Sequence, residues 1–131
     1  PVVLIAHSLG CVTVAHWAAQ AAPALLARVC GALLVAPADV ERADCPAALR
    51  NFAPLPRAAL PFPSVLVGSS NDHAADAQRA LLFAQRWGSE AVILPNAGHI
   101  NVQSGHQHWE QGFTWLYQLQ AQSDACVQRS A

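Results

Sequence analysis

Residues 2–6 read Val-Val-Leu-Ile-Ala, an apolar run with no polar residue alternating in it. Such a run is typical of a strand covered on both faces, and strands of this kind occur in parallel sheets flanked by helices. A second apolar run covers residues 32–36, and the alanine-rich segment between them, residues 9–22, has helical character and stops at Pro23. This order predicts a right-handed βαβ unit with its first strand in the centre of a parallel sheet.

The remainder of the chain continues this alternation. Strands are predicted at residues 64–68 and 91–94, a helix at residues 77–87 that stops at Gly88, and a last helix built on Trp109, Phe113 and Leu116. Prolines crowd residues 37–63 and predict a long surface loop there.

The predicted architecture belongs to the α/β class. We expect three αβα layers around an open, doubly wound and mostly parallel sheet. With 131 residues, the chain has the length of one domain. We expect this domain to occupy residues 1–121, and residues 122–131, which turn polar, to form a C-terminal tail that frays.

The charge and composition of the chain exclude several classes of partner. The net charge is −1, and the seven lysines and arginines form no cluster, so neither nucleic acid nor an anionic membrane is an expected partner. Apolar runs end long before the ~20 residues of a membrane helix, which favours a soluble, cytoplasmic protein. The four cysteines are spread singly, which favours reduced thiols over a disulfide or a metal site, and no cofactor is expected.

The motif Ala6-His7-Ser8-Leu9-Gly10 stands at the junction of the first predicted strand and the first predicted helix. It is a variant of the G-x-S-x-G motif, in which a strained turn exposes the serine hydroxyl and small flanking residues let strand and helix approach. The helix that begins near Leu9 would direct free N–H groups at an oxyanion, with the Leu9 N–H as the first donor. The alternative interpretation is that Ser8 only caps the helix.

A serine nucleophile needs a base, and that base needs support from an acid. His99 follows the last predicted strand and could take the proton of Ser8. Asp72, after the third strand, is the first candidate for the acid, and Asp39, after the second strand, is the alternative. The order Ser8, Asp72, His99 is the order of nucleophile, acid and histidine along the chain of α/β-hydrolases.

Other histidines offer weaker candidates. His7 lies beside the predicted nucleophile and is a candidate substrate-binding residue, although packing at the strand end explains it equally well. His106 and His108 resemble a metal-binding pair, but they lack a third ligand in the pattern, so no metal site is expected.

Four ordered segments together resemble the small single-domain serine hydrolases of the YdeN and retinoblastoma-binding-protein-9 type. They are residues 2–11, 31–39, 60–64 and 97–101. The resemblance implies a lidless or nearly lidless α/β-hydrolase in which Ser8 is the nucleophile, Asp72 the acid and His99 the base. It also implies carboxylesterase-like activity without fixing a substrate. The chain has no L-x-C-x-E sequence, so retinoblastoma-type binding is not expected and protein partners stay unknown.

The resemblance implies a longer N-terminal part than this chain has. Family members carry a first strand, a loop with the second oxyanion N–H, and a further strand and helix ahead of the strand that leads to the serine. Here Pro1 directly precedes that strand, so we expect an N-terminally truncated chain whose second oxyanion donor lies outside this sequence. Loss of one such donor costs about 10²–10³ in rate, and the chain alone is expected to be a poor enzyme.

Two functions from different classes are therefore to be compared. The first is a carboxylesterase-like serine hydrolase that acts on a small ester or related acyl substrate through an acyl-enzyme on Ser8. The alternative is a non-catalytic module that keeps the α/β-hydrolase fold for binding a protein. A covalent serine probe separates them, because only the first function needs a reactive Ser8.

Overall fold

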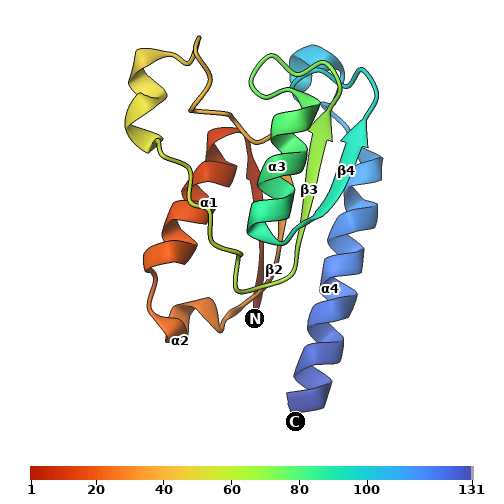
Figure 1. Cartoon of the computed structure of the whole chain (residues 1–131). Coiled ribbons are helices and arrows are strands. Elements are labelled where there is room, and N and C mark those ends of the chain that lie inside the picture. Colours follow the sequence, from red (N-terminus) through yellow and green to blue (C-terminus); the bar gives the residue numbers. More distant parts are fainter. Residues whose placement is uncertain (131) are drawn as a thin grey trace.

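The computed structural model describes residues 1–130 (Figure 1). Within these residues, four parallel strands form one sheet in the order β1-β2-β3-β4. The strands are β1 (Val2–His7), β2 (Val29–Val35), β3 (Ser64–Ser69) and β4 (Glu90–Leu94). Because the strands are parallel, their carboxyl ends lie at the same end of the sheet, where ligand sites of open α/β sheets are found.

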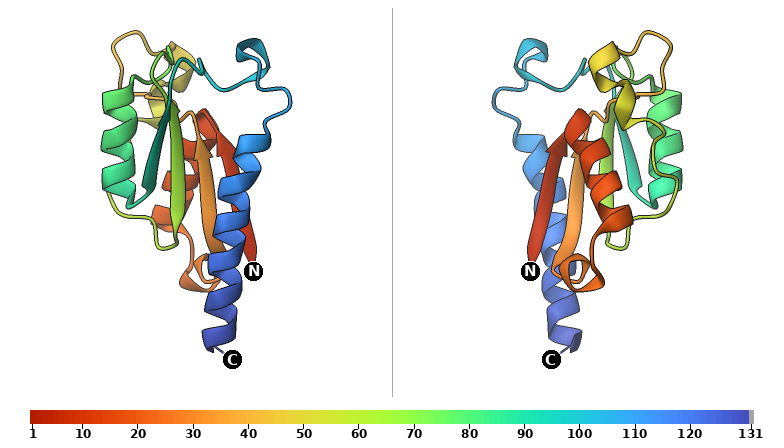
Figure 2. Two further views of the ribbon diagram at one scale, coloured as in Figure 1. Left: turned by 90° about the vertical axis from the view of Figure 1, so that its right-hand side faces the viewer. Right: turned by 90° about the vertical axis from the view of Figure 1, so that its left-hand side faces the viewer.

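Helices cover both faces of the sheet. They are α1 (Leu9–Gln20), α2 (Pro23–Leu26), α3 (Ala77–Trp87) and α4 (Glu110–Ser130), with short 3-10 helices η1 (Ala47–Phe52) and η2 (Val102–Ser104). Figure 2 shows α1 and α3 on one side of the sheet and α4 on the other. The predicted α/β class with three layers is confirmed. Among the described residues, no helix is long and apolar enough to cross a membrane.

The hydrophobic core has two parts, one on each face of the sheet. Successive side chains of a strand point to opposite faces, so the middle residues of the two central strands must be apolar on both faces to serve both parts. All six residues of β3 are buried. The part between the sheet and helices α1 and α3 includes Cys11, Val12, Leu34, Leu66, Phe83 and Trp87. The part between the sheet and α4 includes Leu33, Val35, Val65, Val67, Trp115 and Leu119.

Local signals set the ends of α3. The Asp76 side chain accepts a hydrogen bond from the Arg79 N–H at 2.8 Å and so caps the first turn. Gly88 follows the helix with φ of 71°, a left-handed conformation that costs glycine little and ends the helix at the predicted residue.

The position of β1 differs from the prediction of a central strand. Among the described strands, β1 pairs only with β2 and lies at an edge of the sheet. Val2 and Ile5 are consequently 47% and 62% exposed. An apolar run indicates that a strand is suited to a buried environment. Which strands lie beside it in the sheet depends on segments elsewhere in the chain.

Two helical segments also differ from the prediction. The first helix ends before Pro23 as predicted, at Gln20, but Pro23 opens the additional short helix α2, at a first-turn position where its missing N–H costs nothing. α4 continues through Ser130, so the segment expected as a fraying tail is helical as far as the structure describes it, and Ala131 lies outside the described residues.

Candidate active site

Ser8 occupies the turn between β1 and α1 in a strained conformation, with φ of 58° and ψ of −119°. This region of backbone space is costly for any residue other than glycine and is typical of functional sites. Ser8 stands at the N-cap position of α1, yet its side chain makes no capping bond to the described residues. Its Oγ instead lies 2.9 Å from Nε2 of His99. The capping interpretation therefore does not account for this serine.

The turn is held to the end of β2 by two backbone bonds. The Ser8 N–H donates to the carbonyl of Val35 at 2.9 Å, and the Ala38 N–H donates to the carbonyl of Ser8 at 3.3 Å. A methyl group added at Gly10 would lie 3.5 Å from Cβ of Ala6, already in van der Waals contact. Larger residues at either position would push α1 away from β1, which explains the small residues of the motif.

His99 and Asp72 lie beside Ser8 in a chain of hydrogen bonds. Nδ1 of His99 is 2.9 and 3.0 Å from the two carboxylate oxygens of Asp72, and the Asp72 side chain is only 2% exposed. An ionised carboxylate only accepts, so Nδ1 carries the ring proton and Nε2 of the neutral ring is free to accept from the Ser8 hydroxyl. The Ala74 N–H donates to Oδ1 of Asp72 at 2.8 Å and holds the carboxylate in place.

Asp39, the alternative acid, faces a different partner. Its carboxylate is bound by Nε and Nη2 of Arg79 at 2.9 and 3.1 Å, and the same guanidinium reaches Glu41 at 2.8 Å. The Asp39 carboxylate raises the pKa of Arg79 above its ordinary value. Asp39 therefore ties the loop after β2 to α3, whereas Asp72 is the acid that the structure brings to His99.

Glu41 gives this ion-pair cluster a measurable pH dependence. Burial alone would raise the pKa of the Glu41 carboxyl, but the Leu55 N–H and the Arg79 guanidinium outweigh it and hold the pKa below its ordinary value. A lowered folded-state pKa stabilises the fold above the unfolded value of about 4.3 and ceases to do so as the pH falls through the folded value.

We expect Glu41→Gln to lower the free energy of unfolding at pH 7 by about 0.5–1 kcal/mol, because it removes the ion pair between Glu41 and Arg79. The effect is small because both side chains are partly exposed and solvent screens their charges. The difference from the unsubstituted protein should shrink as the pH falls below the unfolded-state value of about 4.3, and should vanish once the pH has passed the lowered folded-state pKa of Glu41. Urea unfolding at pH 7, 5 and 3.5 measures this. A difference that stays constant with pH would mean that the Glu41 charge contributes nothing.

Two further histidines flank His99. His7 is exposed, its Nε2 lies 2.8 Å from the backbone carbonyl of His99, and the two ring centroids are 4.7 Å apart. The ring of His73 is 5.3 Å from that of His99 on an exposed side chain. His7 is therefore next to the candidate base, with one ring nitrogen engaged by the backbone of the loop that carries it.

Cys11 is the other nucleophilic side chain near Ser8. It is fully buried in the first turn of α1, and its thiol donates to the carbonyl of Val35 with Sγ and O 3.4 Å apart. Burial raises the pKa of the Cys11 thiol to about 12. The thiol stays protonated at neutral pH, and since only the thiolate is a good nucleophile, Cys11 does not compete with Ser8.

Sequence reasoning singled out Asp72 but missed the three residues before it. Side-chain oxygens of Ser69, Ser70 and Asn71 bind the backbone of the loop that carries His99. The available signal was an unbroken run of small polar residues between a buried strand and a candidate acid. Such residues compete well for backbone N–H groups.

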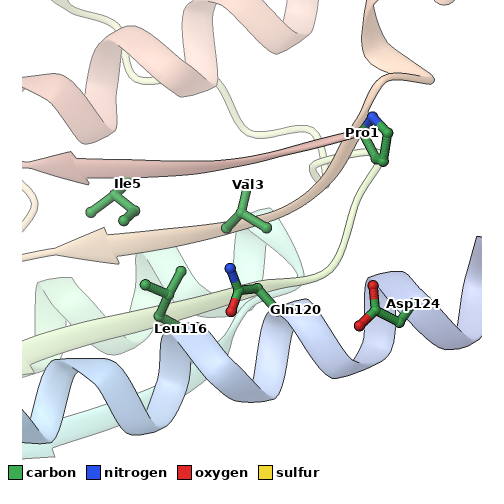
Figure 3. Close-up of a pocket in the computed structure, with 6 residues that line it drawn as sticks. All are labelled: Pro1, Val3, Ile5, Leu116, Gln120 and Asp124. Carbon is green, nitrogen blue, oxygen red and sulfur yellow. The ribbon is translucent and has the colours of Figure 1, made fainter.

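A surface groove of about 540 Å³ lies beside β1 and α4 (Figure 3). Its lining residues are Pro1, Val3, Ile5, Leu116, Gln120 and Asp124. The groove shares no residue with the cluster of Ser8, Asp72 and His99. Among the described residues, no group of three His, Cys, Asp or Glu side chains is placed to hold a metal ion. His106 instead lies 3.0 Å from the Ser104 hydroxyl.

Comparisons with known proteins identify the family and the fold of the chain. The sequence profile of the family described as serine hydrolase matches residues 1–118. The chain is similar to a Pectobacterium atrosepticum protein described as a YdeN-like hydrolase, with 31% identity and a TM-score of 0.69, over 95% of this chain and 58% of that chain. A search of curated proteins finds no match.

Two more distant solved structures share the fold. The esterase domain of a Rhodothermus marinus protein matches with 18% identity and a TM-score of 0.57, over 81% of this chain and 56% of that one. A Xanthomonas campestris pv. campestris protein described as a hydrolase of the alpha/beta superfamily matches with 24% identity and a TM-score of 0.57, over 90% of this chain and 58% of that one. The chain thus spans 56–58% of the length of the three similar proteins.

Proposed function

Because the chain belongs to the serine hydrolase family, we propose that it hydrolyses a small ester or related acyl substrate through an acyl-enzyme on Ser8. The observation that carries this proposal is the pair of hydrogen bonds at His99. Its Nε2 lies 2.9 Å from Oγ of Ser8, and its Nδ1 lies 2.9 Å from Asp72. A nucleophile, a base and an orienting acid within hydrogen-bond reach are what acyl transfer requires.

The first half of the proposed reaction acylates the enzyme. Oγ of Ser8 attacks the substrate carbonyl carbon while Nε2 of His99 takes the hydroxyl proton. The negative charge that forms on the carbonyl oxygen is stabilised by the N–H of Leu9, the first residue of α1, where N–H groups have no intrahelical partner. The bond to the leaving group then breaks, and the leaving group departs with the proton from His99.

The second half releases the product acid. A water molecule gives one proton to Nε2 of His99 and attacks the acyl carbon. When the bond to Ser8 breaks, Oγ regains a proton from His99, and the enzyme returns to its starting state. Asp72 keeps its charge throughout and stabilises the imidazolium that forms twice in the cycle.

Two features suit this site to a small acyl substrate without a cofactor. The chemistry needs only the three side chains and an oxyanion donor. His7 is proposed to line the substrate site, because it is exposed, adjacent to Ser8 in sequence and beside the ring of His99. We further propose that residues 1–121 act as one domain in this function.

A fluorophosphonate probe tests the proposal, because it reacts with an activated serine and copies the tetrahedral intermediate. Full-length gene product that contains these residues should be labelled at one site, and Ser8→Ala should abolish the labelling. Ser64→Ala is the matched control: Ser64 is a buried serine of β3, bonded to the Ser89 hydroxyl at 2.6 Å. It lies at the start of the strand, about 16 Å along it from the end nearest the site.

The outcomes separate the two classes of function. Labelling that is lost in Ser8→Ala and kept in Ser64→Ala supports a working nucleophile. Absence of labelling in folded, full-length protein would refute the hydrolase proposal and favour the non-catalytic binding module.

A further inference from the structure

Two loops at the carboxyl ends of the strands are joined by hydrogen bonds between side chains of one loop and the backbone of the other. The 69–72 loop begins with the last residue of β3 and carries Asp72. The 95–101 loop follows β4 and carries His99. Three consecutive backbone N–H groups of the second loop donate hydrogen bonds to the side-chain oxygens of three consecutive residues of the first. The bonds run from Asn96 N to Ser70 Oγ (2.8 Å), from Ala97 N to Ser69 Oγ (3.0 Å) and from Gly98 N to Asn71 Oδ1 (2.7 Å).

The backbone of the 95–101 loop adopts an unfavourable, left-handed conformation at several residues. Asn96, Gly98 and Ile100 have φ of 50°, 59° and 47°, so left-handed residues lie on both sides of His99. Residues other than glycine adopt this conformation at a cost, and it persists only where the surroundings determine it. The hydrogen bonds from the 69–72 loop stabilise the backbone of the three residues immediately before His99.

Ser69 and Asn71 form a single hydrogen-bonded unit within this contact. The Ser69 hydroxyl is buried, donates to Oδ1 of Asn71 at 2.9 Å and accepts from the Ala97 N–H. Oδ1 of Asn71 therefore accepts from both Ser69 and Gly98, and turning the amide over would place its NH2 group against the Gly98 N–H and lose that bond. Ser70 is exposed and makes a separate bond to Asn96.

We propose that Ser69 and Asn71 are positioning residues that hold the base in register with both the acid and the nucleophile. The unit sets the distance between the 69–72 loop and the backbone that enters His99. The hydrogen bonds of the unit go to the backbone of the 95–101 loop and not to the three reacting side chains. This inference rests on the proposed hydrolase function and names the side chains on which its geometry depends.

The expected effect follows from the short range of proton transfer. Nε2 of His99 must stay within hydrogen-bond reach of Ser8, and a displacement of about 1 Å in such a site costs roughly 10²-fold in rate. Without the unit, Ala97 loses a bond in a buried position and the left-handed turns around His99 relax. Substrate binding is not expected to change, because neither residue is among those proposed to contact the substrate.

The experiment compares Ser69→Ala and Asn71→Ala with Ser64→Ala in the full-length gene product. Ser64 and Ser69 are the first and last residues of β3, both are buried, and both form a hydroxyl hydrogen bond to another side chain. The two serine variants therefore lose similar contacts at opposite ends of one strand. Asn71→Ala is the second variant, and because Asn71 is exposed, this variant keeps the core intact.

The kinetic readout is kcat per active site, with sites counted by burst titration with an activated ester. We expect kcat per site to fall about 10–100-fold in Ser69→Ala and Asn71→Ala with KM unchanged. The double variant should lose little more than either single variant, because the two residues act as one unit. Ser64→Ala should keep its kcat per site. A merely structural role would lower the number of titratable sites and leave kcat per site unchanged, which would overturn the inference.

A second readout does not depend on activity. The proton on Nδ1 of His99, bonded to Asp72, should give a protected downfield NMR signal in the unsubstituted protein and in Ser64→Ala. This signal should be lost by exchange in Ser69→Ala and Asn71→Ala. An inactive protein with this pattern would refute the proposed function and support the positioning role. A signal that persists in both variants would overturn the positioning role whatever the activity.

Discussion

Replacement of Ser8 by alanine is expected to lower kcat by about 10⁴–10⁶-fold, and replacement of His99 by alanine to lower it by a similar factor. The physical reason is that the two side chains are parts of one proton-transfer unit, joined by a 2.9 Å contact between Oγ and Nε2. A serine without its base is a weak nucleophile, and the base without the serine has no proton to take. The double variant should therefore be no slower than either single variant.

Steady-state hydrolysis of an activated ester by the three variants measures this non-additivity. Residual rates of about 10³-fold over the uncatalysed reaction are expected from oxyanion stabilisation and binding. A double variant slower than both single variants by the product of their factors would contradict a single unit. It would mean that Ser8 and His99 contribute to separate steps.

His16 provides the matched histidine control. It lies in α1 away from the site, and its Nε2 contacts the backbone carbonyl of Phe52 at 2.7 Å. His16→Ala also removes an imidazole and a hydrogen bond, so it should lower stability without changing kcat. Added imidazole should restore part of the activity of His99→Ala and none to Ser8→Ala, because only the first variant lacks a base.

Features that depend on local sequence could be predicted for this chain. The β3 strand, the end of α3 at Gly88 and the turn at Ser8 each follow from residues that are neighbours in sequence. Apolar runs, a glycine after a helix and a serine between small residues carry enough information for this. The resemblance to a serine hydrolase family had the same basis and is confirmed.

Features that depend on distant residues could not be predicted in the same way. Whether Asp39 or Asp72 faces His99 is decided by Arg79, which lies 40 positions from Asp39 and engages its carboxylate. The unit of Ser69 and Asn71 likewise acts on backbone groups 27 or 28 positions away. Such contacts leave no periodic pattern in the sequence, because each rests on how two strand ends happen to be juxtaposed.

Asp72→Asn is expected to lower kcat by about 10⁴-fold, the factor seen when the acid of a serine protease triad is replaced in this way. The Asn amide can donate to Nδ1 of His99, and the ring proton would then reside on Nε2. In that tautomer Nε2 donates to Ser8 and cannot take its proton. The variant keeps nearly the same shape, so the loss would arise from the protonation of the ring and from the missing charge.

Asp39→Asn is the matched control for the same substitution at the alternative acid. Asp39 and Asp72 are both buried aspartates in loops that follow strands, and their whole-residue exposures are 4% and 8%. Because Asp39 binds Arg79, its substitution should lower the free energy of unfolding by about 1–2 kcal/mol, a value reduced by the partial exposure of the guanidinium. It should leave kcat per titrated site nearly unchanged.

The ranking of the two variants tests the assignment of the acid, because charge and size change equally in both. Rates measured per titrated site remove the effect of unfolded protein, which is the main effect expected of Asp39→Asn. A large loss in Asp39→Asn with a small loss in Asp72→Asn would reject the contact between Asp72 and His99 as the working one. It would require the loop after β2 to bring Asp39 to the base in the active form, with its bonds to Arg79 broken.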